Sequence, residues 1–267
     1  LRTEFRTNYT PLYLYQLIVG DWLLPAGHDL LVVKYVPVLC DVLVAVLAWK
    51  IVRLRHPEGW APALAFGAVL LAPTVVLNGA YWGQIDSVWT AGLLACVYYL
   101  LVRREALAFL AYGVALAVKV QAVFLLPLLV ALALRRIVRW RAFLLVPAVY
   151  LATLVPALIA GRSFGSLVNL YRDQAGYFGE LTVNAPNMYA WIPERFSDRL
   201  DEAATLGALV VLGAATLLAA RFPRRLDDEA IVALAAFSVL LAPFVLPHMH
   251  DRYFYAADVL TIVLAFY

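Results

Sequence analysis

Charged residues are scarce in this chain of 267 residues: only 15% are Asp, Glu, Lys or Arg, whereas 64% are hydrophobic. A soluble domain is typically about 25% charged and about 45–50% apolar. So few charges cannot cover a water-facing surface, and several apolar runs exceed about 18 residues, the length that crosses a hydrocarbon core. The composition therefore excludes a soluble enzyme and a nucleic-acid binder. It predicts an all-α, polytopic transmembrane helical bundle.

Cysteine is also rare. Cys40 and Cys96 lie inside apolar runs, where they read as small hydrophobic residues, and so few cysteines exclude a disulfide scaffold. The chain starts at Leu1 with no signal peptide before it. We therefore expect it to be the N-terminally incomplete part of a longer protein.

Several enzyme motifs are missing. The sequence has no Gly-rich phosphate loop, no zinc-protease helix motif and no G-x-S-x-G elbow. It also lacks paired aspartates of the D-x-D kind, which a nucleotide-sugar transferase with a metal-bound diphosphate would usually show. Nucleotide chemistry is therefore not indicated.

What is abundant is apolar sequence, in nine segments that each predict a membrane span. The predicted spans are residues 30–52, 60–79, 87–102, 105–118, 122–134, 142–160, 203–220, 230–247 and 255–267. Arginine follows every second span, at Arg53, Arg55, Arg103, Arg104, Arg135, Arg136, Arg139, Arg141, Arg221, Arg224 and Arg225. Because cytoplasmic loops carry an excess of Lys and Arg, these loops are predicted to be cytoplasmic. The other connections are then extracytoplasmic.

The extracytoplasmic connections have a different character, rich in aromatic and isolated polar residues. They are residues 1–29, 79–86, 119–121, 161–202 and 247–254. Aromatic residues such as Trp22 and Trp82 are typical of membrane interfaces. We therefore expect a single transmembrane domain over residues 1–267 that carries its chemistry on this face. The long loop 161–202 is interpreted as a lid or an acceptor-binding segment, or alternatively as a helix lying flat on the membrane.

The segment from Glu105 to Arg135 predicts a short hairpin with a buried lysine. Two spans of about 14 residues would each be roughly 21 Å long, against a hydrocarbon core of about 30 Å. The turn at 119–121 would then lie below the outer surface, where irregular backbone is tolerated only beside a protein cavity or water. A lysine there costs at least about 2.5 kcal/mol, which favours a partner or an anionic ligand for Lys119. The alternative is that Lys119 snorkels to the interface.

Two further polar clusters stand out. The first contains Trp82, Gln84 and Asp86, of which the carboxylate suits a helix N-terminus. The alternative to that N-cap role is a sugar pocket, since Gln84 supplies a donor and an acceptor and Trp82 a stacking face.

The second cluster, residues 247–253, is the densest in polar residues. His248 and His250 could ligate a metal on an extended segment, but no third ligand is apparent from the spacing. His250 and Arg252 are better suited to a phosphate, because Arg offers a bidentate fork and His donates one hydrogen bond near neutrality. The alternative is a surface turn with Asp251 and Arg252 as a loose ion pair.

Three motifs occur in a familiar order and spacing: Trp82 to Ser87, Val118 to Gln121 followed by Pro127, and Met249 to Tyr253. Together they resemble the integral-membrane glycosyltransferases of the GT-C class, especially bacterial relatives of polyprenyl-phosphate-mannose-dependent mannosyltransferases. Segments 8–13 and 184–191 are similar to further stretches of that family, so the resemblance covers most of the chain. Val120 stands where relatives often have proline, and Asp251 where glutamate is common.

The resemblance implies a GT-C-like fold and an inverting transfer of a hexose, with mannose expected. The donor would be a polyprenyl-phosphate-linked sugar in a bacterial plasma membrane, and the acceptor a hydroxyl of a glycan, lipid or protein on the extracytoplasmic side. No nucleotide or metal cofactor is implied. Lys119, His250 and Arg252 would contact the donor phosphate. The sugar and acceptor pocket would contain Trp82, Gln84, Asp86, Gln121, His248 and Asp251.

The general base of that family is an aspartate that we expect upstream of Leu1. Two other functions remain open at this point. A transporter or flippase of a lipid-linked sugar would also place short helices and buried cations at a central site, although it should show inverted repeats. A membrane scaffold without catalytic activity would not need Lys119 or the polar residues 248–252 in apolar surroundings.

Overall fold

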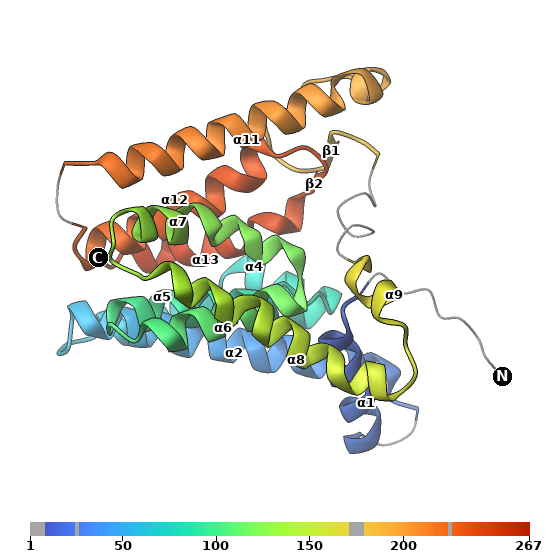
Figure 1. Ribbon diagram of the computed structural model, residues 1–267. Coiled ribbons are helices and arrows are strands. Elements are labelled where there is room, and N and C mark those ends of the chain that lie inside the picture. The colour runs from blue at the N-terminus through green and yellow to red at the C-terminus, as the bar shows by residue number, and fades with distance from the viewer. Residues whose placement is uncertain (1–8, 25–26, 171–178, 224–225) are drawn as a thin grey trace.

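The structure is a computed structural model that describes residues 9–24, 27–170, 179–223 and 226–267. Asn8, Arg224, Arg225 and residues 171–178 of the predicted loop lie outside this range. The described chain is a bundle of helices with one two-stranded sheet (Figure 1). The all-α prediction is therefore confirmed.

The helices follow one another along the chain with short connections. The first half contains α1 (Pro11–Leu23), α2 (Asp29–Arg55), α3 (Ala61–Leu70), α4 (Pro73–Val75), the π-helix η1 (Val76–Trp82), α5 (Asp86–Leu101), α6 (Glu105–Val118), the 3₁₀-helix η2 (Val120–Leu125) and α7 (Leu126–Leu134). The second half contains the 3₁₀-helix η3 (Trp140–Leu144), α8 (Leu145–Ile159), α9 (Phe164–Val168), β1 (Thr182–Val183), the 3₁₀-helix η4 (Glu194–Phe196), α11 (Ser197–Arg221), α12 (Asp228–Val245), β2 (Met249–His250), the 3₁₀-helix η5 (Asp251–Phe254) and α13 (Tyr255–Leu264).

The number of membrane spans differs from the prediction. Each of the nine predicted segments is helical, but among the described residues only four helices are long and apolar enough to cross a membrane. These are Asp29–Arg55, Trp140–Ile159, Glu194–Arg221 and Asp228–Val245. The pair Ala61–Leu70 and Pro73–Trp82, bent by 42°, makes a fifth if it counts as one span. Nine spans are therefore not confirmed.

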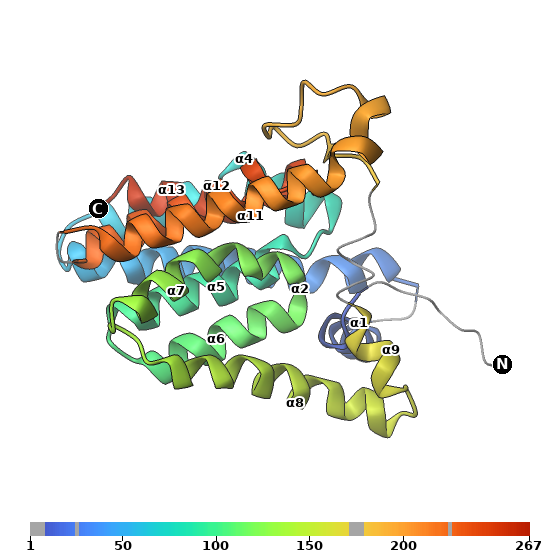
Figure 2. The ribbon, with the colours of Figure 1, turned by 45° about the horizontal axis from the view of Figure 1, so that its top comes forward.

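The remaining helices are shorter, and one of them, α5, is enclosed by its neighbours. Helix α5 has 16 residues, most of them buried, and lies against α2, α6 and α13. Figure 2 shows α8 at one side of the bundle and α11 with α12 at the other, with α5 between them. A helix enclosed in this way is buried by its neighbours, so its apolar residues contact other helices rather than lipid. Its apolar residues therefore predicted the helix correctly, whereas its role as a full membrane span is not confirmed.

The predicted hairpin is confirmed. Helix α6 ends at Val118, Lys119 adopts an extended conformation (φ −155°, ψ 137°), and η2 starts the return to α7. The Thr10 hydroxyl donates a hydrogen bond of 2.9 Å to the Val118 carbonyl, which ties the start of α1 to this turn. The turn is thus held by its own two helices and by the start of α1, and it lies inside the protein.

The basic loops meet at one end of the bundle, which we call the basic end. Arg103 binds Asp228 at 2.9 Å, and Arg139 binds Glu105 at 3.1 Å. The Arg135 guanidinium donates to the Phe222 carbonyl at 2.7 Å. Figure 1 shows the C-terminus at this same end. The alternation of arginine along the sequence therefore corresponds to two physically different ends.

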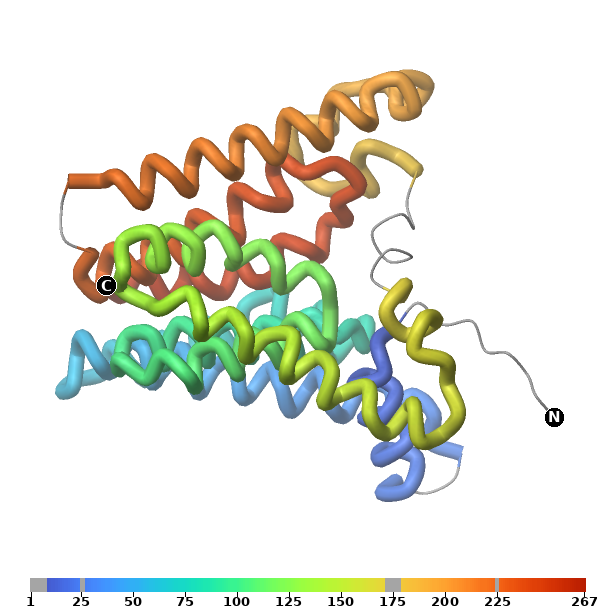
Figure 3. The backbone as a smooth tube through the Cα atoms, viewed as in Figure 1, coloured from blue at the N-terminus to red at the C-terminus, as the bar shows by residue number. Residues whose placement is uncertain are grey.

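The opposite end carries α1, α9 and the small sheet, and we call it the site end (Figure 1). In the sheet, β1 pairs in parallel with β2, so that Val183 lies opposite His250. Figure 3 shows how the segment before α11 comes beside the connection between α12 and α13. Residues 179–196, which we call the covering loop, thus fold over the motif that starts at residue 247.

Candidate functional site

A buried ion pair between Asp86 and Lys119 is the centre of the polar residues at the site end. The Lys119 ammonium lies 2.5 Å from Asp86 Oδ1, and the two side chains are 10% and 0% exposed. The same carboxylate accepts hydrogen bonds from Trp89 Nε1 at 2.9 Å and from Asn78 Nδ2 at 3.0 Å. Each oxygen of Asp86 therefore has a donor, which is what a buried charge requires.

This pair decides between the alternatives for both residues. Lys119 is buried against a carboxylate, so the snorkelling interpretation is wrong. The N-cap interpretation of Asp86 is also wrong, because Ile85 occupies the N-cap and the Asp86 oxygens bind side chains instead. The local cause is that Asp86 begins α5 and Lys119 follows α6, two antiparallel helices packed against each other.

Arg252 joins this cluster from a third segment. Its guanidinium lies 5.6 Å from the centre of the Trp82 ring and 5.8 Å from that of Tyr253. The Lys119 ammonium lies 4.9 Å from the same Tyr253 ring. Buried Nε of Arg252 has no hydrogen-bond partner among the described residues. The structure therefore brings two cations, Lys119 and Arg252, to one aromatic ring, and leaves a donor of Arg252 open.

His250 and Asp251 lie beside Arg252. His250 Nδ1 contacts the Asp251 carboxylate, which also accepts the backbone N–H of Arg252 at 2.7 Å. The His250 ring lies 6.0 Å from that of Trp82. Burial of the ring, followed by the positive charge of Arg252, lowers the pKa of His250 below its ordinary value. The imidazole is therefore harder to protonate than that of an exposed histidine.

His248 is oriented differently from the rest of its motif. Its φ of 61° turns the residue toward the covering loop. There Nδ1 lies 2.8 Å from the Glu180 carbonyl and Nε2 lies 2.6 Å from Asp201 Oδ1. One ring nitrogen thus fastens the loop before α11, and the other contacts α11 itself. The structure does not join His248 to the cluster through these contacts, in contrast to its predicted place in the pocket.

Gln84 and Gln121 flank the cluster. Gln84 is half-buried, and its backbone N–H donates to the Asn78 carbonyl at 2.9 Å. Gln121 is 8% exposed, and its Oε1 has no hydrogen-bond partner among the described residues. The same holds for Oδ1 of Asn78. Two buried acceptors near the ion pair are therefore available to a hydroxyl donor.

Sequence reasoning missed several contributors to this site. Asn78 and Tyr253 were present in the motifs but received no role, although they hold Asp86 and the two cations. Asp41, in the middle of α2, was missed entirely. The available signal was a carboxylate within a long apolar run, which by itself indicates a functional position in a membrane helix.

The overall fold has a counterpart among solved structures. The crystal structure of ArnT from Cupriavidus metallidurans bound to undecaprenyl phosphate superimposes with a TM-score of 0.65 at 14% sequence identity. The match covers 97% of this chain and 49% of that one, so the chain spans about half the length of the protein it matches. No curated protein sequence matches the chain.

The sequence also matches a family model. The model describes glycosyltransferase family 87, and the match covers residues 8–247, most of the chain. Together with the fold, it confirms the predicted resemblance to membrane glycosyltransferases of the GT-C class. The chain belongs to glycosyltransferase family 87.

Proposed function

We propose that this chain transfers a hexose, with mannose expected, from a polyprenyl-phosphate carrier to an acceptor hydroxyl. The observation that carries the proposal is the convergence of Lys119 and Arg252 on one aromatic ring at the end of a largely apolar helical bundle. Cations in such a place favour an anionic ligand. ArnT, which shares the fold, binds undecaprenyl phosphate, and this supports a lipid phosphate as that anion.

Arg252 is the group best prepared to receive the phosphate. Asp86 already neutralises Lys119, whereas the Nε donor of Arg252 is open. A guanidinium presents two parallel N–H groups to a phosphate, and these charge-assisted hydrogen bonds are strong. Lys119 would add a further donor. His250 would donate from Nε2 only as an imidazolium, because its Nδ1 already contacts the Asp251 carboxylate.

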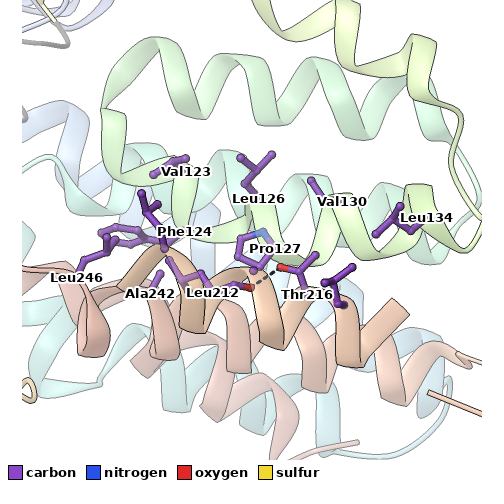
Figure 4. Close-up of a pocket in the computed structure, with 13 residues that line it drawn as sticks. Val123, Phe124, Leu126, Pro127, Val130, Leu134, Leu212, Thr216, Ala242 and Leu246 are labelled. Carbon is purple, nitrogen blue, oxygen red and sulfur yellow. Dashed lines mark hydrogen bonds between the residues drawn. The ribbon is translucent and has the colours of Figure 1, made fainter. Parts of the chain in front are cut away.

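An apolar groove supplies a place for the prenyl chain. It has a volume of about 480 Å³ and lies between α7 and α11, with Ala242 and Leu246 of the α12 end at its base. Figure 4 shows Phe124 and Leu246 at one end and Leu134 at the other. Thr216 is the one hydroxyl residue in the lining, and it donates to the Leu212 carbonyl at 2.7 Å. The groove therefore offers a chain of hydrocarbon an almost purely apolar surface.

The groove and the cations are adjacent. The groove residues Val123 and Phe124 belong to η2, which begins directly after Lys119, and Leu246 directly precedes the motif of Arg252. From there the groove runs along α7 toward the basic end. A lipid phosphate with its head at Arg252 could thus lay its chain parallel to the helices, as membrane lipids lie.

The chemistry follows from this placement. The acceptor oxygen forms a bond to the anomeric carbon on the face opposite the phosphate. The bond from that carbon to the phosphate oxygen breaks, its electron pair stays on the phosphate, and polyprenyl phosphate leaves. Arg252 and Lys119 stabilise the charge that grows on the leaving oxygen. The acceptor proton goes to a carboxylate base.

The charge distribution supports an orientation for this site. Arginine-rich loops gather at the basic end and the cluster lies at the other, so the positive-inside tendency favours an extracytoplasmic position for the cluster. The proposed setting is therefore a bacterial plasma membrane with the acceptor arriving from outside. Candidate acceptors are a glycan, a lipid or a protein.

A transfer assay tests the proposal. Full-length protein in lipid nanodiscs is given polyprenyl-phosphate mannose, and transferred sugar and released polyprenyl phosphate are measured. Loss of a charged hydrogen bond of about 1.5–3 kcal/mol predicts a roughly 10–100-fold fall in kcat/KM for Arg252→Gln. Arg195→Gln is the matched control, because Arg195 also lies over a ring, that of Phe196, in the covering loop.

The contradicting outcomes are distinct. If proteoliposomes move the intact lipid-linked sugar across the membrane without bond cleavage, the protein is a transporter or flippase. Binding with neither transfer nor transport indicates a scaffold. Equal kinetics for the Arg252 and Arg195 variants would remove Arg252 from the phosphate site.

A further inference from the structure

Asp41 is a buried carboxylate that the proposed reaction does not use. It lies near the middle of α2, one of the helices long enough to span the membrane, and is 4% exposed. Ionisable residues in such positions are rare and usually functional. Asp41 contacts two segments of the molecule, η1 and the start of α13.

One face of α2 packs against the segment that carries Asp86. Pro37 and Asp41, one helical turn apart, lie on this face. The Ser87 hydroxyl donates to the Pro37 carbonyl at 2.9 Å. A Cβ atom added to Gly79 would collide with the Asp41 carboxylate, so the backbone of η1 lies directly against that side chain. Asp41 and its neighbour therefore hold the segment from η1 to the start of α5.

Asp41 also contacts the segment that carries Arg252. The Tyr255 hydroxyl donates to Asp41 Oδ1 at 3.0 Å, and Tyr255 is fully buried. Tyr255 begins α13 and follows Arg252 by three residues. A single carboxylate thus touches two of the three segments whose side chains form the cluster.

The segment η1, which Asp41 contacts at Gly79, also carries residues that bind the cluster. It is a π-helix, a rare form that occurs frequently at functional sites. Asn78, on the same turn as Gly79, donates to Asp86, and Trp82, at the end of η1, lies under Arg252. A displacement of η1 would therefore move a partner of Asp86 and a partner of Arg252 together.

We propose that Asp41 is a positioning residue of the transferase site: by binding Tyr255 and abutting Gly79, it sets the distance between the Asp86–Lys119 pair and Arg252. This inference rests on the proposed function for its kinetic consequence. Its geometric part concerns only how η1 and the start of α13 are held.

Three variants of the full-length protein test it by kcat, KM and thermal unfolding. Asp41→Asn keeps an acceptor for Tyr255 and should stay within about threefold of wild-type kcat, since the geometry is kept. Asp41→Val and Tyr255→Phe remove the bond, and misplacement of about 1 Å predicts a fall in kcat of up to about 100-fold. The KM for the donor should change by far less, and the double variant should be no worse than the poorer single one.

A matched tyrosine provides the control. Tyr267 donates to the Ile51 carbonyl at 3.1 Å, so it also binds α2, but at the basic end. Tyr267→Phe should leave kcat unchanged. Asp41→Val alone leaves the buried Tyr255 hydroxyl without its acceptor and should lower the unfolding temperature somewhat. The double variant Asp41→Val with Tyr255→Phe leaves neither partner unpaired, so its unfolding temperature should stay close to that of the wild type while its kcat stays low.

Several results would overturn the inference: wild-type kcat in Asp41→Val, an equal loss in Asp41→Asn, or, in the double variant, a loss of kcat matched by a loss of thermal stability. Failure of the proposed function is a separate result, because then the wild type transfers no sugar at all. In that case hydrogen exchange still tests the geometry. Exchange at residues 78–87 must be faster in Asp41→Val than in Asp41→Asn, and equal rates would refute the positioning role.

Discussion

At the scale of single residues, the burial of Asp86 and that of Lys119 depend on each other. Either charge alone would be expensive inside a membrane protein. As a pair, with Asn78 and Trp89 completing the hydrogen bonds of the carboxylate, they can be buried. The pair also holds the ends of α5 and α6 together at the site end. Its role is therefore structural as well as electrostatic.

This pairing predicts a stability effect. Lys119→Met leaves Asp86 buried without its cation and should lower the free energy of unfolding by about 3–5 kcal/mol. The double variant Asp86→Asn with Lys119→Met removes both charges and should recover most of that loss, though not transfer activity. Denaturant unfolding in detergent measures both. Equal stability of wild type and Lys119→Met would show that the pair is not formed.

The residues of the site were only partly predictable. Lys119 could be placed in a buried turn from the lengths of its flanking apolar runs alone. Its partner could not, because 33 residues separate it from Asp86 and no local pattern encodes that contact. His248 was placed in the pocket by its neighbours in sequence, whereas its positive φ turns it to Glu180 and Asp201. The roles of the site residues in catalysis stay predictions.

At the scale of elements, the long helices followed directly from hydrophobic runs, and the hairpin of α6 and α7 followed from run length and charge. The π-helix η1 did not, because its backbone depends on the contact of Gly79 with Asp41 from another helix. Nor did β1 and β2, which are two residues long and exist only as a pair. Elements that depend on a distant partner show no hydrophobic periodicity in their own sequence, so they could not be predicted from it.

The groove between α7 and α11 gives a prediction for this scale. Gly213 lines the groove, and a side chain there would meet open space. Gly213→Phe should therefore fill the groove and displace part of the prenyl chain from its apolar walls. Each Å² of apolar surface that the chain no longer buries weakens binding by about 25 cal/mol, so the KM for a long-chain donor should rise roughly tenfold or more.

The control lies on the same helix. Gly207 also faces open space but is not among the groove residues, so Gly207→Phe should leave KM unchanged. A donor with a short prenyl chain should be less affected by Gly213→Phe. If both phenylalanine variants bind the long-chain donor equally well, the groove does not hold the chain.

At the scale of the whole molecule, the separation of a basic end from a site end is the main feature. The basic end is closed by ion pairs and by contacts of the last residues, since His56 Nε2 lies 2.7 Å from the Phe266 carbonyl. The site end is covered by the loop that pairs with β2. Sequence alone predicted this separation from arginine alternation. The nine predicted spans are not confirmed, because only four or five of the described helices are long and apolar enough to cross a membrane.

Labelling of single cysteines tests the orientation. With Cys40 and Cys96 replaced by alanine, one cysteine is introduced at Glu58, near the basic end, or at Arg162, near the site end; both positions are exposed. A membrane-impermeant maleimide applied to intact cells should label Arg162→Cys directly and Glu58→Cys only after permeabilisation. The reverse pattern would place the cluster on the cytoplasmic side.

The central claim is that the cluster of Lys119 and Arg252 receives the phosphate of a lipid carrier. The most direct measurement is a cryo-electron microscopy structure of the full-length protein with polyprenyl phosphate. The account predicts phosphate density within hydrogen-bonding distance of the Arg252 guanidinium, and chain density entering the groove beside Phe124. Phosphate density among the arginines of the basic end, with none at Arg252, would contradict it.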